Sequence, residues 1–137
     1  MIDRYSLDAN VILRYLLRDD EGLYRKAESI FIAIESGEIE GYLDSVNLGE
    51  VVWVLKSFYQ LPLTEIRDGL LSILKLDHLI MDDKDRYVTA LTLYAHSVKH
   101  FGDACACTAA VDHCAGRLFS FDRKLDRVPG ILRKEQY

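Results

Sequence analysis

The alternation of short strand-like runs with longer helix-like stretches is the feature that most constrains the fold of this chain. In residues 21–37, for example, apolar residues recur at the spacing of a helix, and Gly37 can end the helix; these residues are Leu23, Ala27, Ile30, Phe31 and Ile34. Strands that alternate with helices favour a parallel sheet covered by helices on both faces. The sequence therefore predicts an α/β fold around a central, mostly parallel sheet.

The predicted elements cover most of the chain, and the helix over 63–75 is expected to be capped by Thr64. We predict strands at 4–7, 41–46, 77–82 and 117–121, a candidate edge strand in 130–137, a turn or short helix at 122–128, and helices at 10–17, 21–37, 47–59, 63–75, 82–100 and 103–116.

Composition and segment lengths predict one globular domain over residues 1–137. Half of the residues are hydrophobic and 28% are charged, as in ordinary globular proteins, and no linker, repeat or low-complexity tract interrupts the pattern. The apolar runs are too short to cross a bilayer core of about 30 Å. Asp3 and Arg4 stand where a signal peptide needs apolar residues, so we expect a cytoplasmic protein with no membrane association.

The three cysteines bear on the cellular compartment and on zinc binding, and the net charge bears on nucleic-acid binding. An odd number of cysteines fits a reducing compartment, and their spacing lacks the gap of structural zinc pairs. Cys107 and Cys114 lie seven residues apart and are predicted to pack in the core, as is Trp53. A net charge of −5 argues against a general nucleic-acid binder, although a local basic rim remains compatible with one.

Four carboxylates are predicted to lie at one edge of the sheet. Asp8 and Asp122 each follow a predicted strand, Glu50 lies in the first turn of the helix after the second strand, and Asp103 begins the helix over 103–116. Because crossovers between parallel strands are right-handed, the carboxyl ends of the strands share one edge, where ligands bind.

Each acid also has a simpler explanation. Aspartate is a preferred helix N-cap, and Glu50 follows Asn47 at the spacing of a capping box. If the acids converge, however, their repulsion requires a cation, and oxygen ligands favour magnesium or manganese. The four histidines are scattered, and the GxxxxGK, HExxH and GxSxG signatures are absent, so the corresponding hydrolase classes lack support.

Four blocks, LDANVILRYLLRDD, LGEVVWVL, FGDACACTAA and FSFDRKLDRVPG, resemble in order and spacing the PIN-domain nucleases, in particular the VapC toxins of VapBC toxin–antitoxin modules. The resemblance implies a three-layer α/β/α PIN-like fold and a Mg²⁺- or Mn²⁺-dependent endoribonuclease. It also implies that Asp8, Glu50, Asp103 and Asp122 form the catalytic metal site. Asn10 and Ser120 fit the neighbouring polar positions that orient carboxylates or water, although an ordinary turn hydrogen bond explains each equally well.

The sequence departs from the family pattern in three places. A further acid often found near His100 is missing, and CACTAA is smaller than the usual aliphatic helix. Asp126 is a second acid in the last block, where it either joins the site or lies on the surface near Arg123 and Arg127.

The implied mechanism is attack of a metal-activated water on an RNA phosphodiester. Residues that either contact the RNA backbone or are plain solvated surface are Arg14, Arg18, Lys124 and Arg127. The resemblance further implies a homodimer, with Trp53, Phe58 and Tyr59 as candidate interface aromatics, and a VapB-like antitoxin partner.

We expect the antitoxin to dock near Leu16, Leu23 and Phe31, whose spacing also fits plain core. Two other functions remain open, a non-catalytic PIN-like regulator and another metal-dependent phosphoesterase.

Overall fold

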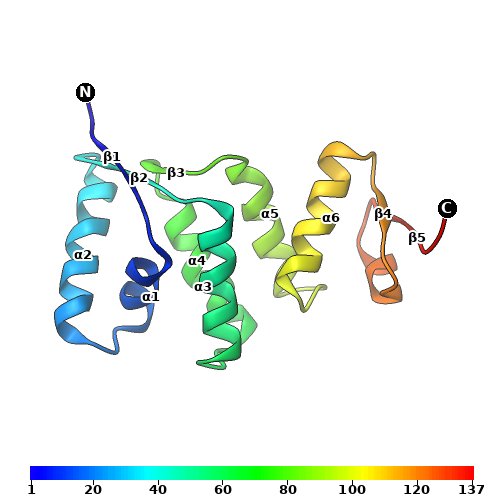
Figure 1. Ribbon diagram of the computed structural model, residues 1–137, viewed down its shortest axis with the longest axis horizontal. Coiled ribbons are helices and arrows are strands. Elements are labelled where there is room, and N and C mark those ends of the chain that lie inside the picture. Colours follow the sequence, from blue (N-terminus) through cyan, green and yellow to red (C-terminus); the bar gives the residue numbers. More distant parts are fainter. The chain divides into compact units, whose positions relative to one another are not determined.

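The computed structural model describes all 137 residues, which form two compact units, residues 1–82 and 83–137. The first unit contains three strands and four helices (Figure 1). These are β1 (Arg4–Ser6), α1 (Ala9–Leu17), α2 (Glu21–Ser36), β2 (Glu40–Tyr42), α3 (Ser45–Ser57), α4 (Leu63–Leu74) and β3 (Leu79–Ile80). The second unit contains α5 (Lys84–Tyr94), α6 (Phe101–His113), β4 (Arg117–Phe119), the 3₁₀ helix η1 (Arg123–Arg127) and β5 (Leu132–Lys134).

In the first unit, β2 is the central strand of a three-stranded parallel sheet, between β1 and β3. Gly41 of β2 allows α2 to pack closely on this sheet, because a Cβ atom there would lie 2.7 Å from Ile34 Cδ1 and 3.0 Å from Leu7 Cδ1. The largest fully buried side chains of this unit are Ile12, Ile34, Leu43, Leu48, Leu55, Ile66, Leu70, Ile73, Leu74 and Leu79.

In the second unit, α5 and α6 pack against each other, and β4 pairs with β5 in parallel. Leu91 and Tyr94 of α5 and Ala104 and Cys107 of α6 are almost fully buried. Gly116 adopts a left-handed φ of +85° between α6 and β4, and its N–H donates to the carbonyl of Ala110. This turn follows α6, which ends at His113 and not at the predicted position 116.

The predicted α/β class with parallel strands is confirmed, and most of the predicted elements are present. The strand predicted over 41–46 is wrong at its end, because Asp44 caps α3 and the helix therefore begins at Ser45. Thr64 is not a cap, since Pro62 occupies the N-cap position of α4. The helix predicted over 82–100 ends at Tyr94.

Two side chains predicted in the core are exposed. Trp53 is 63% exposed on α3, and Cys114 is exposed because the helix ends before it. None of the helices combines the length and apolar character that a membrane crossing requires. That residues 1–137 form one domain stays a prediction.

Candidate active site

Asp8 is both a helix cap and an exposed carboxylate. It precedes α1 in extended conformation, and its Oδ1 accepts a hydrogen bond from the N–H of Asn10 at 2.8 Å. An N-cap carboxylate satisfies one of the donors that a helix start leaves unpaired. Asp8 therefore does act as a helix cap, and this role uses only one of its two carboxylate oxygens.

Asn47 joins the start of α3 to the start of α1. Its N–H and its Nδ2 both donate to Asp44, each at 2.8 Å, and its Oδ1 accepts the N–H of Ala9 at 3.0 Å. Asp44, not Asn47, is thus the cap of α3, and Glu50 lies in the second turn rather than the first. The capping-box explanation of Glu50 is therefore wrong. Sequence reasoning missed the role of Asn47, whose only local signal was its position three residues after an aspartate.

Asp8 and Glu50 line the same cleft of about 280 Å³ in the first unit. Asn10 and Asn47 belong to the same lining, which combines these polar groups with an apolar and aromatic wall. The rest of the lining is Ala9, Leu13, Arg14, Leu17, Val54, Phe58 and Tyr59. The structure thus places two of the four predicted acids in one cavity, although 42 positions separate them in the sequence.

Arg14 is held at the cleft by Asp19. Arg14 Nη1 lies 3.2 Å from Asp19 Oδ1, and the hydroxyl of Tyr59 donates to Asp19 Oδ2 at 3.2 Å. Partial desolvation acts to raise the pKa of Asp19, but the hydrogen bond and charge of Arg14 lower that pKa overall. Arg14 therefore already has a carboxylate partner in the structure.

Arg18 is engaged in the same way just beyond the end of α1. Its Nη2 lies 3.0 Å from Glu21 Oε1, and its guanidinium lies 4.3 Å from the ring centre of Tyr24. Arg14 and Arg18, two of the residues predicted to contact RNA, are thus ion-paired.

Asp103 lies in the second unit, in the first turn of α6 rather than at its start. The N-cap position belongs to His100, and Asp103 is half-buried. Burial raises the pKa of the neighbouring Cys107 thiol, and the negative charge of Asp103 raises it further. The prediction that Asp103 begins this helix is therefore wrong by two residues.

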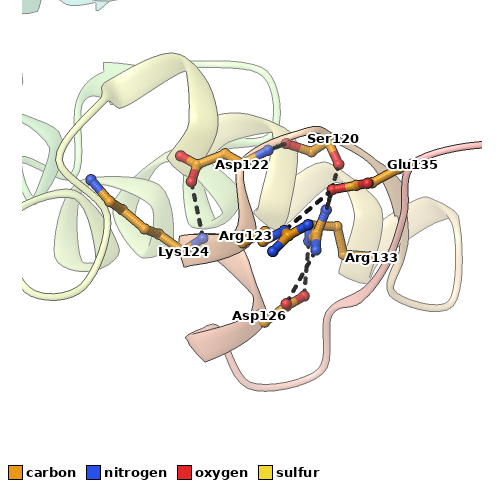
Figure 2. Close-up of polar contacts among 7 residues, drawn as sticks. All are labelled: Ser120, Asp122, Arg123, Lys124, Asp126, Arg133 and Glu135. Carbon is orange, nitrogen blue, oxygen red and sulfur yellow. Dashed lines mark hydrogen bonds and ion pairs between the residues drawn. The ribbon is translucent and has the colours of Figure 1, made fainter.

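Asp122 ends the turn between β4 and η1 and caps η1. Its Oδ1 accepts the N–H of Lys124 at 2.9 Å, and its own N–H donates to Ser120 Oγ at 3.1 Å (Figure 2). Ser120 thus makes the turn hydrogen bond that was one of its two predicted roles. Asp126 faces Arg133, whose Nε lies 2.9 Å from Asp126 Oδ1. Lys124 and Arg127 are exposed on η1.

The side chains of the first unit fit a hard divalent cation better than a soft one. Neither unit by itself places three or more His, Cys, Asp or Glu side chains to hold a metal. Mg²⁺, however, usually binds through one or two carboxylates and keeps several waters, a requirement that Asp8 and Glu50 can meet. In the second unit, burial raises the pKa of the Cys105 thiol to about 11, which disfavours the thiolate that zinc binding there would need.

These features define an α/β protein with parallel strands. Asp8 lies where β1 leads into α1, and Asp122 lies where β4 leads into η1, so each carboxylate is at the carboxyl end of a strand in its own unit, where such folds bind ligands. The model of the PIN-domain family matches residues 5–131. The chain belongs to the PIN-domain family, which gives it the three-layer α/β/α fold of these domains. Searches of curated proteins and of solved structures each gave no significant match. PIN domains are generally metal-dependent nucleases, so the chain is at this coarse level a hydrolase of the nuclease class.

Proposed function

We propose that this protein is a Mg²⁺- or Mn²⁺-dependent endoribonuclease, a single PIN domain that acts as the VapC-type toxin of a type II toxin–antitoxin module. The observation that carries the proposal is the position of Asp8 and Glu50 in one cleft of a chain that the PIN model matches over 5–131. Structural capping alone does not require Glu50, which caps no helix, to line the cleft that Asp8 lines.

In the first unit, Asp8 and Glu50 would hold the metal in the cleft that both line. Asp103 and Asp122 are the proposed metal ligands of the second unit. A bound divalent ion supplies a water of lowered pKa and a countercharge for the phosphoryl oxygens of the substrate. The bonds around the acids serve to fix them. The cap on Asp8 Oδ1 leaves its Oδ2 for a ligand, and the Asn47 bridge ties the helix of Glu50 to the start of α1. Asn10 and Ser120 support the turns that carry Asp8 and Asp122.

The RNA backbone would be contacted by basic side chains. Lys124 and Arg127 are the better candidates, because they are exposed on η1 beside Asp122. Arg14 and Arg18 would first have to exchange their carboxylate partners for phosphate.

The proposed antitoxin would dock in the apolar groove of about 390 Å³ between α1 and α2. Val11, Leu23, Ala27 and Ile30 form its apolar lining, and Asn10, Arg14 and Lys26 form its polar lining. Leu16 and Phe31, also predicted for this surface, do not line the groove. Phe31 is only 2% exposed and belongs to the core, which is the alternative that its spacing allowed.

The proposed homodimer is supported by exposed aromatic residues at the end of α3. Trp53 and Phe58 are 63% and 75% exposed, and Phe58 packs edge-on against Tyr59 with ring centres 5.0 Å apart. We expect Trp53→Ser to lower the molecular mass found by light scattering from that of a dimer to that of a monomer. A monomeric parent protein would contradict this part of the proposal.

The test is to incubate the purified protein, freed of any partner, with total RNA, single-stranded DNA and a generic phosphate ester, with and without Mn²⁺. Asp8→Asn and Glu50→Gln should abolish metal-dependent RNA cleavage. Asparagine is as good an N-cap as aspartate, so the first variant removes the charge of Asp8 and keeps its structural role.

The matched control is Asp20→Asn. Asp20 caps α2 by accepting the N–H of Leu23 at 3.0 Å and lies outside the cleft, so this variant should cleave like the parent. Cleavage of the ester or DNA in place of RNA would favour another phosphoesterase. No cleavage by the parent, with toxicity in cells retained by Asp8→Asn, would favour a non-catalytic regulator.

A further inference from the structure

Arg133 of β5 carries the densest set of polar contacts in the second unit. Its side chain is only 10% exposed, and its Nε and Nη2 donate to the two carboxylate oxygens of Asp126 at 2.9 and 3.3 Å. Its Nη1 donates to Glu135 Oε1 and to the main-chain carbonyl of Ser120, both at 2.8 Å (Figure 2). A guanidinium donates in one plane in a fixed geometry, so these contacts fix the position of the Ser120 peptide group.

The Ser120 peptide group is directly connected to Asp122. The β4–β5 pairing reaches only Phe119 and Lys134, so the residues that follow lie outside the regular ladder. Ser120 is held there by the bond from its N–H to the carbonyl of Lys134 at 3.1 Å and by the bond from Arg133 to its own carbonyl. Its hydroxyl in turn accepts the N–H of Asp122, whose Oδ1 accepts the N–H of Lys124.

Neutralisation of the charge of Arg133 does not explain why its guanidinium also donates to the carbonyl of Ser120. Two carboxylates, Asp126 and Glu135, already compensate the charge of Arg133. The bond to Ser120 adds no charge compensation, yet it joins this ion-pair cluster to the turn that carries a candidate metal ligand. Asp126 is engaged in the same cluster, which gives it a function other than binding a metal.

We propose that Arg133 is a positioning residue that, through the carbonyl and hydroxyl of Ser120, holds the carboxylate of Asp122 in the orientation needed to bind the divalent ion. This inference rests on the proposed function, because it gives Asp122 the role of a metal ligand. Arg133 itself touches neither metal nor substrate.

The direction in which the affinity for a divalent cation changes when Arg133 is replaced distinguishes a positioning role from a purely electrostatic one. Replacing Arg133 by Gln removes a positive charge near Asp122, and by Coulomb's law alone that change should tighten the binding of a divalent cation. Loss of positioning predicts the opposite result, weaker binding by about tenfold, as is typical for residues that support metal ligands.

Arg123→Gln is the matched control. Arg123 lies next to Asp122 in the sequence, its side chain is 85% exposed, and its only ion pair is with Glu135 at 3.9 Å. The variant removes one positive charge, as Arg133→Gln does, and leaves the bond from Arg133 to Ser120 intact. Its Mn²⁺ affinity should equal or exceed that of the parent.

The experiment titrates Mn²⁺ into the full-length parent, Arg133→Gln and Arg123→Gln proteins, with free Mn²⁺ followed by electron paramagnetic resonance. Amide hydrogen exchange of Asp122 and Lys124 is measured on the metal-free proteins, because these two N–H groups make the bonds that the turn depends on. We expect Arg133→Gln alone to bind Mn²⁺ about tenfold more weakly and to lose protection at both amides.

If Arg133→Gln does not fold, Arg133→Lys provides the test. It keeps the charge, but a single ammonium group cannot reproduce the planar donor set of the guanidinium, so Mn²⁺ binding should still be severalfold weaker than in the parent. Affinity unchanged or increased in the Arg133 variants, or unchanged protection of the Asp122 amide, overturns the proposal. If the parent itself binds no Mn²⁺, the proposed function fails, and the amide exchange alone then decides whether Arg133 holds Asp122.

Discussion

Replacing Asn47 by Ala should destabilise the first unit and disorganise the cleft. The change removes the acceptor of the Ala9 N–H, and Ala9 is only 4% exposed, so that donor is left unpaired in the interior. An unpaired buried donor costs about 1–3 kcal/mol, and loss of the Asn47–Asp44 side-chain bond adds about 0.5–1.5 kcal/mol. We therefore expect the free energy of unfolding to fall by about 1.5–4.5 kcal/mol.

The assay is urea denaturation followed by circular dichroism, together with amide exchange at Ala9. Asn10→Ala is the matched control, because Asn10 lies in the same cleft with an exposed side chain and its main-chain bond to Asp8 survives the change. Asn47→Asp keeps an acceptor for Ala9 but places a second carboxylate beside Asp44, and should be destabilising for that reason. A loss below about 0.5 kcal/mol in Asn47→Ala, with Ala9 still protected, would refute the reasoning, since even a single orphaned donor predicts more.

The remaining predictions concern helix ends and acid stability. Gly116→Ala should lower the free energy of unfolding by more than about 2 kcal/mol. The φ angle of Gly116 is +85°, and the new Cβ atom would lie 2.0 Å from the carbonyl oxygen of Gly130. An unchanged thermal melting curve would contradict this prediction. Gly102→Ala has open space in α6 and should stabilise by about 0.5–1 kcal/mol in the same assay. Hydrogen bonds from the main-chain N–H and the side chain of Asn47 lower the pKa of Asp44 in the folded protein. The ionised Asp44 therefore stabilises the fold fully at pH values above 3.8, the pKa it has when unfolded, and this stabilisation is lost as the pH falls through the lowered pKa. Asp44→Asn should therefore flatten the loss of stability in acid titrations below about pH 4, and an unchanged acid slope would count against it.

Local patterns predicted the elements well where the periodicity was strong. The helix predicted over 47–59 is present as α3 and buries the face formed by Leu48, Val51, Val52 and Leu55. Gly37 ends α2 in a left-handed conformation, as its position after the periodic run indicated. The errors fall at helix starts, where several polar residues compete for the cap. The sequence did not show whether Asp44 or Asn47 caps α3, because aspartate and asparagine are both good N-cap residues.

Exposure was harder to predict than secondary structure. Trp53 lies within an apolar run of α3 and was expected in the core, yet α3 buries only one face and turns this side chain outward. Cys114 keeps the seven-residue spacing from Cys107, but the helix ends at His113 and the shared face ends with it. A spacing argument holds only as long as the helix continues.

The sequence by itself determined the α/β class, the parallel strands and the identity of the candidate acids, because periodicity and residue type are local properties. Only the tertiary structure decided that Asp8 and Glu50 share a cleft and that Arg133 holds the turn of Asp122. Each of these arrangements depends on hydrogen bonds between distant segments, Asn47 to Ala9 and Arg133 to Ser120, that no local pattern encodes.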